Sequence, residues 1–208
     1  MNSLNSPLLL ASASPRRADI LRAAGIPFHV VPSAYEEPAP VSSDNPRPAE
    51  YVMRLAREKA AHALFDAAQY GASPLVLAAD TIVWHENEIL GKPKDENDAR
   101  HMLRRLRGQS HTVFTGICLR HGDDFHLAHD ATTVHFGLVS GAWIEAYVRS
   151  GEPMDKAGAY AAQGKGAGLV TGINGDFWNV VGLPVATLGR LLETVGAPLE
   201  SWWSENDF

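Results

Sequence analysis

A continuous apolar run from Leu75 to Ala79 ends abruptly in Asp80. An uninterrupted run of this kind is typical of a strand that is buried on both faces, which requires helices on both sides of a sheet. The carboxylate that follows is expected at the C-terminal edge of the strand. Because ligands of open α/β sheets bind beyond the carboxyl ends of strands, Asp80 is a candidate for chemistry.

Strand and helix patterns alternate before this run, and two hairpin patterns follow it. The pattern predicts strands at 8–11, 28–31 and 75–79, hairpins over 81–90 and 112–136, and helices over 15–25, 47–70, 95–107, 140–149 and 184–195. A proline-rich segment at 33–48 is expected to be a functional loop or flap, and a glycine-rich segment at 158–175 to bend sharply or approach a ligand. This order favours an α/β fold: a mixed sheet with flanking helices.

Length and charge limit the classes of protein that fit. A chain of 208 residues is expected to form a single domain over residues 1–208, and a net charge of −6 argues against binding to a nucleic acid polymer. Apolar runs fall far short of the roughly 20 residues that a membrane span needs. A single cysteine, Cys118, and the lack of a secretory signal pattern favour the cytoplasm.

The first candidate site is the turn between the strand at 8–11 and the following helix. Ser12, Ser14, Arg16 and Arg17 surround a helix start that Ser14 and Pro15 mark as an N-cap and a first turn. Unpaired backbone N–H groups and the helix dipole favour an anion there. The alternative is an ordinary capped helix with two solvated arginines.

The second candidate is Asp80, which is followed by Thr81. A carboxylate at this place can bind a metal or take a proton from water, and the alternative is an Asx turn. Glu37, with Glu36 beside it, could complete a metal set, and Lys59 and Lys92 a phosphate set, although a charged residue taken singly is more often solvated.

Three further features point to structure rather than to a site. The glycines from Gly164 to Gly168 do not fit the register of a known phosphate loop. The histidines between positions 121 and 135 lack zinc spacing and are expected on the surface or across strands. Cys118 is expected to be buried in its strand, and Trp202–Trp203 to be a packed tail or an interface.

The opening motif Leu10-Ala11-Ser12-Ala13-Ser14-Pro15-Arg16-Arg17 is followed by five others: Ala79-Asp80-Thr81, Leu90-Gly91-Lys92-Pro93, Gly108-Gln109-Ser110-His111-Thr112-Val113, Asp155-Lys156-Ala157-Gly158-Ala159-Tyr160, and Val181-Gly182-Leu183-Pro184. Together these motifs resemble the Maf family of nucleoside triphosphate pyrophosphatases. They follow the family's order over about residues 7 to 195. Ala13 stands where glycine is frequent in the family.

The resemblance implies an elongated mixed sheet with a deep cleft, similar to the inosine triphosphate pyrophosphatases. It implies hydrolysis of nucleoside triphosphates to monophosphate and pyrophosphate with a divalent cation such as Mg²⁺ or Mn²⁺. Carried over by motif, Asp80 accepts the proton of the attacking water, and Arg16, Thr81 and Gln163 tune base choice. Glu37, Lys59 and Lys92 match positions associated with metal and triphosphate. A homodimer is expected only from the family.

The segment from Ala159 to Gly164 resembles the branch that acts on dTTP and UTP, and the 7-methyl-GTP branch carries glutamate at the Gln163 position. An amide can donate to a uracil or thymine carbonyl and accept from N3–H, whereas a carboxylate only accepts, which suits guanine. Two alternatives stay open at this point: a modified-purine pyrophosphatase, and a nucleotide-sensing regulator of septum formation.

Overall fold

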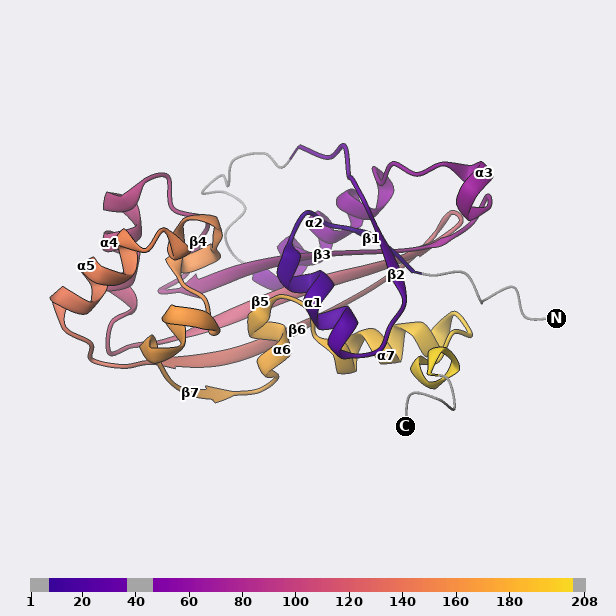
Figure 1. The fold of residues 1–208 in the computed structure, drawn as a ribbon. Helices are drawn as coiled ribbons and strands as arrows, with labels where there is room; N and C mark the ends of the chain where they lie inside the picture. The colour runs from indigo at the N-terminus through magenta and orange to yellow at the C-terminus, as the bar shows by residue number, and fades with distance from the viewer. Residues whose placement is uncertain (1–7, 37–46, 204–208) are drawn as a thin grey trace.

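The computed structural model describes residues 8–36 and 47–203, and it contains a seven-stranded mixed sheet (Figure 1). The strands are β1 Leu8–Ala11, β2 Phe28–Val31, β3 Leu75–His85, β4 Glu88–Leu90, β5 Ser110–His121, β6 Asp124–Phe136 and β7 Val170–Asn174. Their order is β2-β1-β3-β5-β6-β7, and β4 pairs with β3. β1 lies parallel to β2 and β3, whereas the pairs from β3 to β7 are antiparallel.

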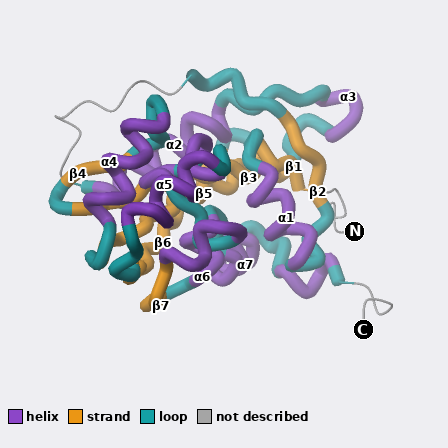
Figure 2. Tube along the Cα trace, turned by 60° about the vertical axis from the view of Figure 1, so that its left-hand side comes forward, coloured by secondary structure: helices purple, strands orange, loops and turns teal. Residues whose placement is uncertain are grey.

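Helices lie on both faces of the sheet and at one end of it. They are α1 Pro15–Ala23, α2 Pro48–Ala61, α3 Ala67–Tyr70, α4 Glu96–Leu106, α5 Gly141–Arg149, α6 Phe177–Val181 and α7 Val185–Thr194. Short 3₁₀ turns are η2 Glu152–Asp155, η3 Ala157–Ala159, η4 Gly164–Leu169 and η5 Leu199–Trp202. Figures 1 and 2 show α4 and α5 together at one end, far from α3. The expected α/β class, with its elongated mixed sheet, is confirmed.

The apolar run of β3 is buried on both faces, as the sequence predicts. Leu77 and Ala79 pack into the cluster formed with α1 and α7, and Val76 and Ala78 pack against α2 on the other face. Successive side chains of a strand point to opposite faces, so each face receives every second residue of the run.

Asp80 lies inside β3 and not at its C-terminal end, so the expected position at the strand edge is wrong. β3 continues because β5 pairs with it without interruption from Leu75 to Trp84. On the other side β1 pairs only with Val76 and Leu77, and β4 begins its pairing at Val83. Among the described residues no strand covers β3 between these two partners, so the sheet has a bare internal edge over residues 78–82.

A glycine brings α2 close to the sheet next to Asp80. Gly116 of β5 pairs with Asp80, and a Cβ on Gly116 would lie 2.4 Å from the carbonyl carbon of Val52 in α2. Any side chain at this position would therefore push the helix backbone away from the strand.

Other expectations differ from the structure in detail. The predicted helix over 47–70 is two helices, because the chain between them pairs with the segment after β2: Ser33 bridges Ala63, and Leu64 N donates to Pro32 O. β7 and α6 were not predicted. The two hairpins are confirmed, with positive φ angles at Glu86, Asn87 and Gly122 in their turns.

The remaining structural expectations concern single residues and the tail. Cys118 is fully buried in β5, as expected. Trp202 packs against the cluster of α1 and α7, and Trp203 Nε1 donates to Ala24 O at 3.0 Å, so this part of the tail is packed. The described histidines form no metal cluster with other ligand types, and within the described ranges every helix is too short or too polar to span a bilayer.

Candidate active site

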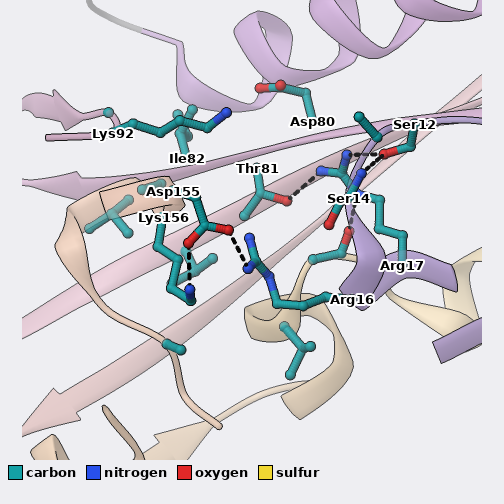
Figure 3. Close-up of a pocket in the computed structure, with 18 of the residues that line it drawn as sticks. Ser12, Ser14, Arg16, Arg17, Asp80, Thr81, Ile82, Lys92, Asp155 and Lys156 are labelled. Carbon is teal, nitrogen blue, oxygen red and sulfur yellow. Dashed lines mark hydrogen bonds and ion pairs between the residues drawn. The ribbon is translucent and has the colours of Figure 1, made fainter. Parts of the chain in front are cut away.

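A cleft with a volume of about 1230 Å³ opens at the bare edge of β3 (Figure 3). Its lining includes the residues expected for substrate binding and catalysis, namely Ser12, Ser14, Arg16, Arg17, Lys59, Asp80, Thr81, Lys92 and Gln163. Glu37 lies outside the described residues, as does most of the expected flap. The structure thus brings the candidates from five separate parts of the chain together in one cavity.

Asp80 and Thr81 enter the cleft from opposite faces of the sheet. Asp80 points toward α2, whereas Thr81 points toward Arg17 and Ser12 at the start of α1 (Figure 3). Neighbouring residues of one strand can both reach the cavity only because the edge of β3 is bare at this point. The cleft therefore connects the two faces of the sheet.

The Asp80 carboxylate is held by a lysine from α2. Lys59 Nζ lies 2.5 Å from Asp80 Oδ1, and only 6% of Asp80 is exposed. Lys59 belongs to the last turn of α2, where a cation is favoured by the helix dipole. The close approach of α2 at Gly116 sets the position of this helix over the strand that carries Asp80.

Arg17 is fixed at the start of α1 by three protein acceptors. Its Nε donates to Gly182 O at 2.9 Å, Nη1 to Ser12 Oγ at 3.1 Å and Nη2 to Thr81 Oγ1 at 3.2 Å. Ser14 is the N-cap residue, as predicted, but its side chain makes no capping hydrogen bond. The guanidinium is thus oriented in the cleft before any anion arrives.

The hydrogen bonds behind Thr81 determine the direction in which its hydroxyl points. Thr115 Oγ1 lies 2.9 Å from the carbonyl oxygen of Asn179, which can only accept, so Thr115 donates there. Thr81 Oγ1 lies 3.0 Å from Thr115 Oγ1 and must donate to it. Thr81 therefore offers an acceptor, not a donor, toward Arg17 and the cleft.

Arg16 crosses the cleft to a residue that was not predicted as part of the site. Its Nη1 pairs with Asp155 Oδ2 at 3.0 Å, and Lys156 Nζ pairs with Asp155 Oδ1 at 2.5 Å (Figure 3). Partial burial raises the pKa of Asp155, but the hydrogen bonds from Lys156 and Arg16 outweigh it and hold the pKa below its ordinary value. One carboxylate thus orients two cations at the wall of the cleft.

Sequence reasoning missed Asp155, Lys156 and the buried pair Thr115 and Asn179. Asp155 and Lys156 lie in one of the motifs quoted above, and their charges next to a glycine-rich segment are a signal that could have found them. Thr115 and Asn179 carry no comparable signal, because only the fold brings α6 against β5.

The donor set suits a cation that is shared with a phosphate ligand. No group of three His, Cys, Asp or Glu side chains occurs in residues 8–36 and 47–203, so this part of the chain offers no closed metal cage. Mg²⁺ commonly binds through one or two carboxylates, waters and the oxygens of a bound phosphate. Asp80, beside the cations of the cleft, fits that mode.

Comparisons with known proteins agree with the geometry. Residues 7–195 match the family model of the Maf-like proteins. A protein of Symbiobacterium thermophilum named dTTP/UTP pyrophosphatase is 47% identical, with 92% of this chain and 95% of the relative covered. Relatives of the same name from Ruminiclostridium cellulolyticum and Aquifex aeolicus are 45% and 43% identical, over 89% of this chain and 94% and 93% of their own lengths. With its motifs, its mixed sheet and these relatives in agreement, the chain belongs to the Maf family.

Proposed function

We propose that this chain hydrolyses dTTP and UTP to the nucleoside monophosphate and pyrophosphate in the cytoplasm. The relatives named dTTP/UTP pyrophosphatase support the choice of substrate, since they are 43–47% identical over about nine-tenths of the chain. Gln163 supports it too, because one amide can both donate to and accept from the edge of uracil or thymine.

The observation that carries the proposal is the placement of Asp80 and Arg17 in one cleft on opposite sides of β3. A carboxylate that faces fixed cations can activate water next to a bound polyphosphate. Arg16, Arg17, Lys59 and Lys92 of the cleft lining would supply positive charge for the triphosphate, and Gln163 of the same lining would read the base.

Asp80 accepts a proton from water while the water oxygen bonds to the α-phosphorus. The bond from the α-phosphorus to its bridging oxygen breaks, and pyrophosphate leaves with the electron pair. The arginines and lysines of the cleft stabilise the negative charge that gathers on pyrophosphate. Lys59 keeps the Asp80 carboxylate directed into the cleft through its 2.5 Å contact.

A divalent cation belongs to the proposal. Asp80 or Glu37, the latter in the segment outside the described residues, would hold it beside the triphosphate. When bound, the cation neutralises phosphate charge and polarises the phosphoryl group. Addition of a chelator is expected to abolish hydrolysis, and added Mg²⁺ or Mn²⁺ to restore it; full activity in the chelator would contradict the cation requirement.

A panel of triphosphates tests the substrate and the reaction together. Purified protein is incubated with dTTP, UTP, CTP, GTP and 7-methyl-GTP, and the products are separated by ion exchange. Monophosphate and pyrophosphate from dTTP and UTP are expected. A preference for 7-methyl-GTP would support the modified-purine alternative. Tight nucleotide binding without turnover would support a nucleotide-sensing regulator.

A further inference from the structure

The chain on both sides of Gln163 is held by two side chains from outside its own segment. Tyr147 belongs to α5, and Glu152 begins η2. The contacts are Ala161 N to Tyr147 Oη at 3.1 Å, Lys165 N to Glu152 Oε2 at 3.1 Å, Gly166 N to Glu152 Oε1 at 2.9 Å, and Tyr147 Oη to Glu152 Oε1 at 3.1 Å. Tyr147 therefore binds the backbone before Gln163, and Glu152 binds the backbone after it.

The backbone of this segment packs directly on the two side chains. A Cβ on Gly164, whose φ is +66°, would lie 3.0 Å from Glu152 Oε2. A Cβ on Gly166 would lie 2.6 Å from Tyr147 Oη and 2.4 Å from Ala161 O. The glycines, for which the sequence showed no phosphate-loop register, are thus the positions that allow the segment to close on Tyr147 and Glu152.

The Gln163 side chain has no hydrogen-bond partner among the residues that the structure describes, and it is exposed to the cleft. Its amide is consequently placed by the backbone that carries it. An amide that reads a base must present its donor and its acceptor at hydrogen-bonding distance, so a shift of the backbone by even 1 Å weakens both contacts.

The protonation states of the pair match these contacts. Burial raises the pKa of Tyr147, so the phenol stays protonated and can donate to Glu152. Partial burial raises the pKa of Glu152, but hydrogen bonds from Gly166, Lys165 and Tyr147 outweigh it, and the pKa is lowered overall. Near neutral pH the contacts therefore join a phenol donor and a carboxylate acceptor.

We propose that Tyr147 and Glu152, called here the Tyr147–Glu152 clasp, are positioning residues that set the base selectivity of Gln163. The inference rests on the proposed function, because it takes Gln163 to read the base of a triphosphate substrate. The clasp acts through the backbone at residues 161–166 and touches neither the substrate nor the reacting atoms.

Tyr147→Phe tests the clasp, because it removes the hydroxyl that bridges Ala161 N and Glu152. The kcat/KM values for UTP and for ribose 5′-triphosphate, which has no base, are compared. We expect the ratio of the two values to fall about tenfold, the scale of one or two lost hydrogen bonds. The value for ribose 5′-triphosphate should change less than about twofold, since the chemistry at Asp80 is untouched.

A double-variant cycle shows whether the clasp acts through Gln163. In a Gln163→Ala background, Tyr147→Phe should cause no further loss of the UTP ratio, because the reading amide is already absent. The proposal would be overturned if the UTP ratio of the double variant fell by the product of the two single losses. It would also be overturned if Tyr147→Phe alone lowered kcat/KM equally for UTP and for ribose 5′-triphosphate. Tyr70→Phe in α3 is the matched control, outside the lining of the cleft, and should leave both values unchanged.

Glu152→Gln provides a second route if Tyr147→Phe fails to fold. The substitution replaces one acceptor oxygen by a donor that faces the backbone N–H groups, and the same fall in the UTP ratio is expected. Amide hydrogen exchange at residues 161–166 is measured in parallel and should speed up about tenfold in both variants. Wild-type protein that cleaves neither substrate would refute the proposed function, whereas unchanged exchange in the variants would refute the clasp itself.

Discussion

At the scale of single residues, the site depends on neighbours that hold each functional group in one orientation. Lys59 holds Asp80, Asp155 holds Arg16, and three acceptors hold Arg17. Groups that are fixed before the substrate binds need not be ordered during the reaction, which is how polar groups stabilise a transition state in proteins.

Asp80→Asn should abolish most turnover and leave nucleotide binding intact. The amide has nearly the size of the carboxylate but cannot accept the proton of water, so kcat should fall by about two to four orders of magnitude. Single-turnover hydrolysis and equilibrium binding of dTTP measure the two effects. Asp124→Asn, on the exposed start of β6, serves as the control and should keep the wild-type kcat. An unchanged kcat in Asp80→Asn would show that Asp80 is not the base.

Gln163→Glu should reduce activity on pyrimidines more than on 7-methyl-GTP. A carboxylate faces the base carbonyl of dTTP or UTP with unpaired negative charge, and kcat/KM for these should fall roughly 10- to 100-fold. The panel of triphosphates described above provides the comparison. Equal losses for every base would show that the side chain at this position does not read the base.

At the scale of secondary-structure elements, a chain of hydrogen bonds joins α6 to the sheet and to Arg17. Asn179 of α6 donates from Nδ2 to Val113 O at 3.0 Å and to Thr132 Oγ1 at 2.9 Å. Its backbone carbonyl oxygen accepts from Thr115 Oγ1. Asn179, Thr115 and Thr132 are fully buried. Polar contacts therefore fix the short helix α6 to β5 and β6.

Thr115→Val should lower both stability and activity. Valine keeps the shape but leaves the Asn179 carbonyl without its donor and Thr81 without its acceptor, which costs about 1–3 kcal/mol of the free energy of unfolding. Arg17 loses part of its orientation, so kcat/KM should fall as well. Urea denaturation and steady-state kinetics measure the two losses, and Thr115→Ser should restore both; if serine fails to do so, the hydroxyl is not the reason.

Elements with strong local signals were predicted, and elements that depend on tertiary contacts were not. The N-cap of α1 at Ser14, the glycine turn at Gly122 and the apolar run of β3 all follow from local chemistry. β7 lies partly in the glycine-rich segment and contains Gly172, and α6 has five residues, fewer than two helical turns, so neither shows a clear periodic pattern. The position of Asp80 within β3 depends on where β1 ends, which no pattern around residue 80 reveals.

The residues of the candidate site were likewise predictable where they carry a local signal, and not where they depend on tertiary contacts. Ser12, Arg17, Asp80 and Thr81 stand at a visible boundary between an apolar run and polar residues, so the sequence indicated them. Asn179 lies on β5 only because the chain returns to the sheet after β7. Contacts of this kind, between residues more than 60 positions apart, require the fold to be known.

At the scale of the whole molecule, a buried histidine links stability to pH. His111 is 3% exposed and lies between Phe136 and Tyr160, and its Nε2 is 2.7 Å from Tyr160 Oη. Burial, and then the charges of His85 and His135, lower its pKa to about 3 from an ordinary value of 6.5. The folded protein therefore keeps His111 neutral where the unfolded chain protonates it.

The free energy of unfolding should decrease as the pH falls from about 6.5 toward 3. In this window the unfolded state binds a proton that the folded state excludes, at a cost of roughly 1 kcal/mol per pH unit. Urea denaturation between pH 7 and 5 gives the slope. His111→Phe should flatten this slope, whereas the control His121→Gln, on the exposed end of β5, should not. Equal slopes in the wild type and both variants would show that His111 does not cause the pH dependence.

The bare edge of β3 also makes the chemistry depend on strand register. A shift of β3 by one residue against β5 would exchange the sides on which Asp80 and Thr81 emerge, so the carboxylate would turn away from Lys59 and the hydroxyl away from Arg17. Ten consecutive residue pairs with β5 oppose such a shift. The pairing of β3 with β5 thus directs the Asp80 carboxylate to Lys59 and the Thr81 hydroxyl to Arg17.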